Sequence, residues 1–294
     1  MFAAVVVTYN RLNLLQRCIA ALRAQTSRPD ILVINNNSTD GTAPWLDAQP
    51  DLRVFHMAEL LGGAGGFSFG MGQAVRLGYK YIWVMDDDCI PEPTALEELL
   101  KADKHFGLTY GWLSSRCLWT DGSLCRMNIQ RSTPYRDITD FSAPLIPAQM
   151  ASFVSLFLRA ETVRSFGLPI AEFRFWTDDW EYTRRISREK ACYVVRDSVV
   201  THAMTRNTVV NIADDSPDRM NRYFYFYRND VYLYRREGLR GWLWLLAKDS
   251  LHALQTLLKG HPGRIAAIQK GFAAGLHFHP QIHTALDTEP NDER

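Results

Sequence analysis

Short apolar blocks alternate with helical patterns over the first hundred residues. Residues 3–8 read AAVVVT and residues 81–85 read YIWVM. Such short, almost wholly apolar runs are typical of parallel strands covered on both faces. Residues 31–34 and 52–55 predict two further strands, of which the second is weaker. These runs predict the central strands of a buried sheet.

Apolar residues three and four positions apart predict helices between these strands. One helix is marked by Leu12, Leu15, Ile19 and Leu22, a second by Phe67, Met71, Ala74 and Gly78, and a third spans residues 92–105. The third begins beside Pro91 and Pro93, and proline is tolerated in the first turn of a helix. Alternating strands and helices imply βαβ units, so the pattern predicts an α/β fold with a parallel sheet.

The pattern becomes less regular after about residue 109. Short β-like runs at 110–113, 151–158 and 191–195 flank a turn-rich stretch around 120–147, and residues 178–189 predict a helix. From about residue 219 the chain is again helical in pattern, first over the aromatic-rich stretch 223–235 and then over 242–258. The second of these carries a stripe made by Leu243, Leu246, Ser250, Leu254 and Leu257, and a polar tail follows Asp287.

We therefore divide the chain into two parts. Residues 1–205 would form one α/β domain with two halves, 1–108 and 109–205, and residues 206–294 would form a C-terminal helical region. A length of 294 residues suits about two domains of ordinary size. Such a chain can bury a large core without disulfides.

Composition narrows the range of partners. The formal net charge of +1 argues against nucleic acid, whose binding proteins are usually strongly basic. Five cysteines without C-x-x-C spacing predict reduced thiols, and no second pair completes a zinc site with Cys117 and Cys125. We find neither a secretory signal nor a membrane-spanning apolar run, so we expect a cytoplasmic protein that is soluble or peripheral at the inner face of the plasma membrane.

Polar clusters follow three of the predicted strands. Thr8, Tyr9 and Asn10 follow the first strand, residues 35–40 (NNNSTD) follow the second, and residues 86–88 (DDD) follow the fourth. Ligands of open α/β sheets bind beyond the carboxyl ends of the strands. These clusters are therefore the candidate binding site.

The acidic triplet Asp86, Asp87 and Asp88 is the sharpest chemical signal. Adjacent carboxylates repel one another, and their burial is costly unless a cation neutralises them. Alternate residues of an extended chain point the same way, so Asp86 and Asp88 would face one site. Hard divalent cations take carboxylate oxygens and keep phosphate and water as further ligands. A solvated acidic turn is the alternative interpretation.

Residues 61–67 (LGGAGGF) are rich in glycine and open a predicted helix. The backbone at such a position can approach a phosphate or a sugar closely, which makes Gly65 and Gly66 candidate ligand contacts. The segment is not a dinucleotide-binding fingerprint, because Ser68 stands where the third glycine belongs. Tight packing of the helix on the sheet explains these glycines equally well.

Four motifs in order resemble the family 2 glycosyltransferases, which have the GT-A fold. They are VVVTYNR at 5–11, VINNNSTDGT at 33–42, MDDDCIP at 85–91 and WTDDWEYTRR at 176–185, and their order and spacing match the family pattern over about 200 residues. The resemblance implies a Rossmann-like nucleotide-binding sheet that is continuous with an acceptor subdomain. It also implies an enzyme that transfers a sugar from a nucleoside-diphosphate donor and inverts the anomeric centre.

The resemblance assigns the donor site to the polar clusters. The implied contacts to the nucleotide sugar are Thr8, Tyr9, Asn10, Arg11, Asn35, Asn36, Asp40, Asp86 and Asp87, with Gly65 and Gly66. The family usually has Asp at the position of Asn35, and an Asn oxygen can still accept the N3–H of uracil or thymine. A polar turn that caps a helix is the alternative interpretation of residues 36–40.

The motif WTDDWE supplies the implied catalytic base. The second acid of the family's acidic pair has this role, and its position here is Asp179. One carboxylate must take the proton of the acceptor hydroxyl while Mn²⁺ or Mg²⁺ holds the leaving diphosphate. The implied acceptor contacts are Trp176, Asp178, Trp180 and Glu181. Alternatively, the acids only complement the helix dipole and the tryptophans belong to the core.

The resemblance also places a metal-binding histidine at His202, which would complete the site of Asp86 and Asp88. A lone histidine is otherwise more often structural. Arg228, in the motif YRN at 227–229, would touch phosphate or pair with a carboxylate in the core.

The runs GGAGGF, DDD, WTDDWEY and HAM together resemble the galactofuranosyltransferase branch, and rhamnosyltransferases that use dTDP-rhamnose share much of the pattern. The resemblance implies UDP-galactofuranose as donor and a lipid-linked glycan of the cell wall or O-antigen as acceptor. The C-terminal helices would rest on an anionic membrane, dock on their own domain or join two copies of the chain.

Two other classes of protein compete with a transferase. One is a non-catalytic nucleotide-sugar-binding module of a polysaccharide assembly complex, against which the intact Asp179 argues. The other is a nicotinamide-dependent enzyme, against which the incomplete glycine fingerprint and the acidic triplet argue.

Overall fold

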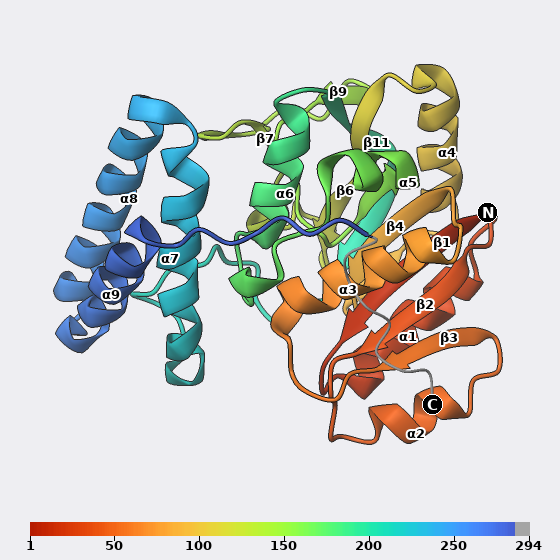
Figure 1. The fold of residues 1–294 in the computed structure, drawn as a ribbon, viewed down its shortest axis with the longest axis horizontal. Coiled ribbons are helices and arrows are strands. Elements are labelled where there is room, and N and C mark those ends of the chain that lie inside the picture. Colours follow the sequence, from red (N-terminus) through yellow and green to blue (C-terminus); the bar gives the residue numbers. More distant parts are fainter. Residues whose placement is uncertain (286–294) are drawn as a thin grey trace.

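The computed structural model describes residues 1–285, so the polar tail after Asp287 lies outside the described residues. An α/β body built on one large sheet stands beside a group of C-terminal helices (Figure 1). The described strands are β1 (Phe2–Thr8), β2 (Asp30–Asn35), β3 (Leu52–His56), β4 (Tyr81–Asp86), β5 (Cys89–Pro91), β6 (Tyr110–Trp119), β7 (Arg131–Thr133), β8 (Arg136–Asp137), β9 (Leu145–Pro147), β10 (Leu156–Arg159) and β11 (Ala191–His202). The described α-helices are α1 (Leu12–Arg23), α2 (Thr42–Asp47), α3 (Gly62–Arg76), α4 (Ala95–Phe106), α5 (Ala160–Phe166), α6 (Asp178–Ser187), α7 (Met220–Arg235), α8 (Gly238–Leu258) and α9 (Ile265–Leu276).

Within residues 1–285, nine strands form one sheet in the order β3-β2-β1-β4-β10-β6-β11-β5, with β9 paired to β11. The strands β1 to β4 are parallel to one another, as the apolar runs predict. Beyond β4 the sheet is mixed, because β10 runs antiparallel between β4 and β6 while β11 is parallel to β6. This second half carries the segments that approach the site from the other side.

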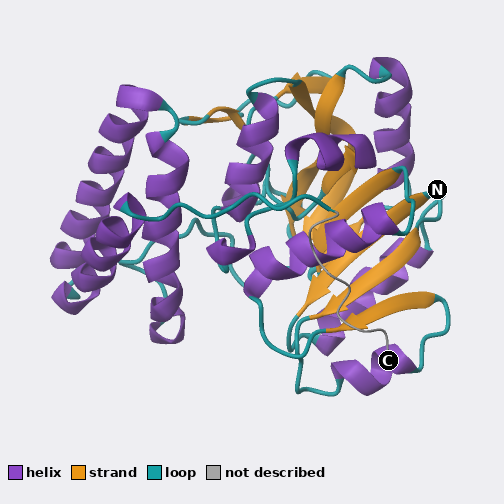
Figure 2. Cartoon of the chain, viewed as in Figure 1, coloured by secondary structure: helices purple, strands orange, loops and turns teal. Residues whose placement is uncertain are grey.

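Helices cover both faces of the sheet (Figure 2). Alternate residues of β1 point to opposite faces: Ala4 and Val6 pack against α1 and α4, whereas Val5 and Val7 pack against α3. Both faces are therefore buried, which explains why the strands have no polar alternation in sequence.

The helices α7, α8 and α9 pack on one another beside the sheet (Figure 1). A Cβ on Gly271 of α9 would lie 2.7 Å from the carbonyl oxygen of Phe224, so glycine permits the close approach of α9 to α7. The end of α7 is joined to α6 by an ion pair of 2.8 Å between Arg184 and Glu237. The C-terminal helices are thus attached to the helix that begins with the acidic pair.

Two expected element boundaries were wrong. The helix expected at 92–105 begins at Ala95, because residues 89–91 form the edge strand β5 against β11. The strand expected over 151–158 is limited to residues 156–159. In the segment before this strand, Ser152 and Ser155 are buried, and their side chains accept hydrogen bonds from Asn128 and Trp83, respectively. The turn-rich stretch also contains the short strands β7 to β9.

We expect Gly70→Ala to destabilise the protein. A Cβ at this position of α3 would lie 2.5 Å from Val5 Cγ1 and 2.9 Å from Ile34 Cγ1, and overpacking of a core typically costs about 1–3 kcal/mol. Urea unfolding would measure the loss. Gly63→Ala is the matched control on the same helix, since its Cβ would meet nothing within 4 Å. Equal stability of the two variants would show that α3 does not pack this tightly.

Candidate functional site

The carboxyl ends of parallel strands bring the polar clusters to one edge of the sheet. In the strand register Thr8 lies beside Asn35, and Val7 lies beside Asp86. From the other half of the sheet, the last residue of β11, His202, pairs with Cys89, which directly follows the acidic triplet. Segments from four distant parts of the sequence therefore meet at one place.

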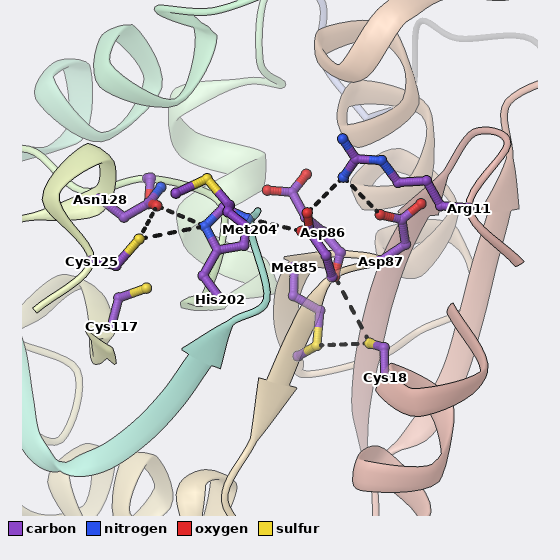
Figure 3. Close-up of polar contacts among 12 residues, drawn as sticks. Arg11, Cys18, Met85, Asp86, Asp87, Cys117, Cys125, Asn128, His202 and Met204 are labelled. Atoms are coloured by element: carbon purple, nitrogen blue, oxygen red, sulfur yellow. Dashed lines mark hydrogen bonds and ion pairs between the residues drawn. The ribbon is translucent and has the colours of Figure 1, made fainter. Parts of the chain in front are cut away.

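Asp88 and His202 lie at the centre of this site. Figure 3 shows His202 with Asn128 and Cys125 on one side and Asp86 on the other. His202 Nε2 is 2.9 Å from Asp88 Oδ1. One potential ligand atom from each of Asp86, Asp88 and His202 lies within 4.8 Å of the others. Asp88 and His202 are buried, and Asp86 is partly exposed. The structure thus brings together the three residues that the sequence analysis assigns to a metal.

Burial and mutual repulsion control the ionisation of these groups. Desolvation, followed by the charge of Asp88, raises the pKa of Asp86 to about 7 and that of Asp87 to about 6. Desolvation also acts on Asp88, but its hydrogen bond to His202 and the charges of His202 and Arg11 hold its pKa below the ordinary value. Burial acts to lower the pKa of His202, yet Asp88 and Cys125 raise it to about 10.

This donor set fits a hard divalent cation. Three adjacent acids share a largely buried site, and Arg11 reaches two of them, with Nη1 2.6 Å from Asp88 Oδ2 and 3.5 Å from Asp87 Oδ1. Burial and the charge of Asp88 raise the pKa of Asp86, so a further cation beside these acids would favour its ionised form. Asp86, Asp88 and His202 would hold Mn²⁺ or Mg²⁺ and leave other positions to phosphate and water.

Asp87 orients the loop that follows β1. Its Oδ2 accepts a hydrogen bond from Thr8 Oγ1 at 2.8 Å and one from the backbone N–H of Tyr9 at 3.4 Å. The Tyr9 side chain is exposed, and Arg11 is half-exposed at the mouth of the acidic cluster. The loop therefore presents an aromatic ring and a guanidinium group beside the acids.

The second polar cluster is tied to this loop. Asn10 Oδ1 accepts a hydrogen bond of 2.6 Å from the N–H of Thr39, and the N–H of Asn10 donates to Ser38 Oγ. The side-chain oxygen of Asn35 accepts from the N–H of Ser38 at 3.1 Å. The sequence predicts this Asn35 oxygen as the acceptor for the N3–H of a pyrimidine base, whereas in the structure it closes a turn.

Asn36 and Asp40 serve the ends of helices. Asn36 donates to the carbonyl oxygen of Gly62 at the start of α3. Asp40 accepts from the N–H of Leu12 at 3.1 Å and of Thr42 at 3.2 Å, which are the first residues of α1 and α2. These contacts agree with the capping interpretation of residues 36–40, which the sequence analysis left open.

Gly65 and Gly66 lie in the first turns of α3 and are buried. A Cβ on Gly65 would lie 2.6 Å from Leu61 Cβ, and one on Gly66 would lie 2.6 Å from Val7 Cγ1. Packing of the helix against the sheet therefore requires glycine at position 66, and contact with Leu61, just before the helix, requires it at position 65. These contacts account for Gly65 and Gly66 without a ligand.

A strained loop delivers the acidic pair to the site. Arg174, Trp176 and Thr177 have φ angles of 58°, 60° and 68°. Residues other than glycine rarely occupy this region, and such strain persists only where the surroundings hold it. The loop ends at Asp178, the first residue of α6.

Helix α7 holds this loop in place. Asn229 is fully buried, and its Nδ2 lies 3.0–3.1 Å from the carbonyl oxygens of Phe173, Phe175 and Trp176. Thr177 Oγ1 donates to Asp230 Oδ1 at 2.7 Å. The motif YRN at 227–229 is thereby explained: its asparagine satisfies the carbonyl groups of the strained loop.

Desolvation raises the pKa of both Asp178 and Asp179, that of Asp179 to about 7. The charge of Asp86 contributes to the shift of Asp178, so the acidic pair and the acidic triplet are electrostatically coupled. Asp179 Oδ1 accepts the N–H of Trp180 at 2.7 Å, and both residues are partly exposed. A carboxylate with a pKa near 7 is well matched to proton abstraction at neutral pH.

The remaining expected acceptor residues have partners within the protein. Glu181 is 3% exposed and forms an ion pair of 3.1 Å with Arg185, which favours a structural role. The Trp176 ring packs against Tyr223 of α7 with a centroid distance of 5.1 Å. Trp180 carries the Arg131 guanidinium 4.6 Å above its ring. Neither tryptophan is a free platform for a sugar in this arrangement.

Comparison with known proteins identifies the fold and the chemistry. Residues 3–115 match the model of "Glycosyl transferase family 2". The chain contains a family 2 glycosyltransferase domain. The matched segment includes the loop after β1 and the whole acidic triplet, which lie at the site described above.

Relatives extend the similarity over most of the transferase. The chain is 27% identical to galactofuranosyltransferase GlfT1 of Mycolicibacterium smegmatis over 282 residues, which are 87% of this chain and 93% of the relative. Its fold resembles that of mannosyltransferase PcManGT from Pyrobaculum calidifontis in complex with GDP-Man and Mn²⁺, with a TM-score of 0.54 and 16% identity over 94% of this chain and 75% of that chain. It also resembles S. aureus TarS 1-349 in complex with UDP, with a TM-score of 0.53 and 14% identity over 78% of this chain and 65% of that chain. These two likenesses confirm the GT-A fold, and helices α7, α8 and α9 confirm the helical C-terminal region.

The transferase has cationic residues near the site that the sequence analysis did not find. Arg219 and Arg222 stand at the start of α7, with their guanidinium groups over the rings of Trp176 and Phe175. Burial, followed by the charges of Arg219 and Arg11, lowers the pKa of Arg222. Arg222 therefore lies near enough to Arg219 and to Arg11 to be repelled by both, and Arg219 also pairs with Asp215 at 3.4 Å. Such a cluster of arginines suits an anionic ligand. By contrast, Arg228 donates to the carbonyl oxygen of Glu172, so it neither faces the site nor pairs with a carboxylate.

A set of residues behind His202 was also missed. His202 Nδ1 lies 2.8 Å from Asn128 Oδ1 and 3.7 Å from Cys125 Sγ. Cys117, Cys125 and His202 offer ligand atoms within 4.8 Å of one another, so a third ligand does stand beside the cysteine pair that the sequence analysis dismissed. Asn128 Oδ1 accepts from Nδ1–H and so orients the ring with Nε2 toward Asp88 and the site.

Proposed function

We propose that this glycosyltransferase is an inverting, metal-dependent enzyme that moves galactofuranose from UDP-galactofuranose to a hydroxyl of a lipid-linked glycan. The observation that supports this proposal most directly is that Asp86, Asp88 and His202 lie together beside the acidic pair of α6. The division into a catalytic domain, residues 1–205, and a helical region that follows it is part of the same proposal.

A divalent cation bound by these three residues would neutralise the diphosphate and favour its departure. Arg11, Arg219 and Arg222 are the chain's own cations near this position, and they would attract and orient the two phosphate groups. Tyr9, Asn10 and Asn35 would line the nucleoside end of the donor.

Asp179 would take the proton of the acceptor hydroxyl as that oxygen attacks the anomeric carbon. The attack comes from the face opposite the leaving diphosphate, which inverts the configuration. Desolvation and the charge of Asp179 hold the pKa of Asp178 well above its ordinary value, which favours a protonated Asp178 that would donate a hydrogen bond to the acceptor. The Asn229 contacts would keep the acidic pair in position during the reaction.

The donor and the acceptor are inferred from the relative. GlfT1 of M. smegmatis is named a galactofuranosyltransferase and covers nearly the whole chain, and the TarS structure holds UDP. A lipid-linked acceptor would place the enzyme in the cytoplasm at the inner face of the plasma membrane. Among the described residues, no helix is both long enough and apolar enough to cross a bilayer.

A donor screen tests this assignment. Purified protein with Mn²⁺ is given UDP-galactofuranose, UDP-galactopyranose, UDP-glucose or dTDP-rhamnose together with a lipid-linked acceptor, and released nucleoside diphosphate and product mass are followed. We expect turnover of UDP-galactofuranose and a β-configured product by NMR. Turnover of dTDP-rhamnose alone would reject the donor, a retained configuration would reject inversion, and no turnover of any donor would favour the binding-module class.

The transfer rate should fall as the pH decreases through about 7. The pKa of Asp179 is raised to about 7, so acidification protonates the base well above the range of an ordinary aspartate. At pH 6 we expect roughly one tenth of the plateau value of kcat. Single-turnover kinetics from pH 5 to 8.5 would measure this. An acidic limb centred near pH 4 would contradict the assigned environment of Asp179.

Asn128→Ala should weaken metal binding without removing a ligand. Loss of the acceptor for His202 Nδ1–H typically lowers metal affinity by about 10- to 100-fold. Isothermal titration of Mn²⁺ into the protein without donor would show it. Asn128→Asp keeps an acceptor oxygen and should recover most of the affinity. Equal Mn²⁺ affinity in Asn128→Ala and the wild-type protein would exclude this role.

A further inference from the structure

Helix α8 presents an apolar face to solvent. Of the described large apolar residues that are exposed, eight belong to this one helix: Leu239, Leu243, Trp244, Leu246, Leu251, Leu254, Leu257 and Leu258. Most expose half or more of their surface. Figure 1 shows α8 on the side of the molecule away from the sheet. Contiguous exposed apolar surface of this kind marks an interaction site.

The width of this face favours a lipid surface over a helical partner. At 100° per residue the exposed positions from Leu246 round to Trp244 span an arc of about 160°. The seam of a two-stranded coiled coil is narrower, since only the a and d positions are apolar. The arc contains Ala247 and Ser250 but no acidic residue, and its one charged residue is Arg240 in the first turn.

The charge around the face is positive. Residues 238–285 contain five lysine and arginine residues and a single acid, Asp249, although the whole chain has a net charge of only +1. Two of these cations have acidic partners: Lys248 pairs with Asp230 and Asp249, and Lys259 pairs with Asp214. Asp249 is buried against Lys248 and shows no charge to solvent. Arg240 and Lys259 stand at the two ends of α8, and Lys270 is exposed on α9. This pattern complements an anionic surface.

From these observations we infer that the outer face of α8 binds the surface of an anionic phospholipid bilayer. The helix would lie in the plane of the interface with its leucines among the acyl chains, and Arg240 and Lys270 would meet the headgroups. The inference rests on the proposed function in one respect: binding to the bilayer would bring the enzyme to its lipid-linked acceptor.

The structure also couples this face to the catalytic loop. Lys248 of α8 pairs with Asp230 of α7 at 2.8 Å, and Asp230 accepts the hydrogen bond from Thr177. Thr177 directly precedes the acidic pair. The position of α8 on a membrane would therefore determine how the acceptor pocket faces the lipid surface.

Vesicle flotation with the full chain and no donor tests the inference. Phosphatidylcholine vesicles with and without phosphatidylglycerol are compared for the wild-type protein, the variant L243Q/L254Q and the control Leu108→Gln. Leu108 is 66% exposed in the turn before β6, far from α8 in the chain. We expect binding to the anionic vesicles, a loss on the order of tenfold or more in the double variant, and no change in the control. Added salt should weaken binding.

The inference would be overturned if the wild-type protein did not bind anionic vesicles, or if L243Q/L254Q bound them equally well. It would also be overturned if the wild-type protein were a dimer that did not bind vesicles and that the double variant converted to a monomer. Sedimentation equilibrium distinguishes the last case. Turnover of a donor with a soluble acceptor should be the same in all three proteins. If none of the three proteins turned over the donor, the proposed function would be rejected, and the vesicle result would still stand.

Discussion

Replacing Asp179 by asparagine should lower kcat by about 10²- to 10⁴-fold while UDP binding stays unchanged. The amide cannot take the proton of the acceptor hydroxyl. It keeps the side-chain oxygen that accepts the N–H of Trp180, so the start of α6 should fold as in the wild-type protein. Single-turnover kinetics and UDP titration would separate the two effects. The residual activity should also lose its dependence on pH near 7.

Asp140→Asn is the matched control for this variant. Asp140 is exposed and likewise accepts a backbone N–H, that of Ser142, but lies in a surface turn. It should transfer sugar at the wild-type rate. Near wild-type kcat in Asp179→Asn would remove Asp179 as the base and turn attention to Asp178.

Asp88→Asn should lower turnover by a similar factor, because it removes a charged ligand of the divalent cation. Asp88 contacts both His202 and Arg11 and has the most strongly favoured ionised form of the acidic triplet. Loss of a charged metal ligand should lower turnover by about 10³-fold, since charge stabilisation by a metal is worth several kcal/mol. Mn²⁺ titration should show weaker binding, and UDP should no longer bind more tightly when Mn²⁺ is present.

A structural control is needed because Asp88 also holds the site together. Thermal unfolding of Asp88→Asn without metal should occur at a lower temperature than in the wild-type protein, because the buried ion pairs with His202 and Arg11 are lost, so Mn²⁺ is titrated well below the unfolding temperature of both proteins. Asp121→Asn changes an exposed acid that closes a surface turn and should leave both metal affinity and turnover unchanged. Unaltered Mn²⁺ affinity in Asp88→Asn would place the cation elsewhere.

The sequence predicted what local patterns control. The strands β1, β2 and β4 are continuous apolar runs that both faces of the sheet bury, so their type and their parallel pairing follow from the pattern. The acidic triplet ends such a strand, and its place at the ligand-binding edge follows from the topology. The strand register confirms the parallel half of the sheet, and the match over residues 3–115 confirms the family resemblance.

The sequence could not predict contacts that depend on distant segments. Asn128 and His202 are 74 residues apart, and neither residue type reveals that they form a hydrogen bond. Arg222 approaches Arg11 only because α7 packs beside the strained loop. Conversely, Glu181 belongs to a motif with catalytic character, but its i+4 neighbour Arg185 satisfies it in the interior.

Glycine-rich sequence was ambiguous for a physical reason. Close approach of a helix to a sheet and close approach of backbone to a phosphate both require the absence of Cβ. Only the distances from Gly66 to Val7 and from Gly70 to Val5 distinguish the two, and they indicate packing.

The most direct test of the central claim is a titration of Mn²⁺ into chelator-stripped enzyme with UDP-galactofuranose and a lipid-linked acceptor. The account predicts no transfer without metal, saturable recovery as Mn²⁺ is added, and loss of that recovery in His202→Ala. Undiminished transfer in excess EDTA would contradict a metal-dependent mechanism at Asp86, Asp88 and His202.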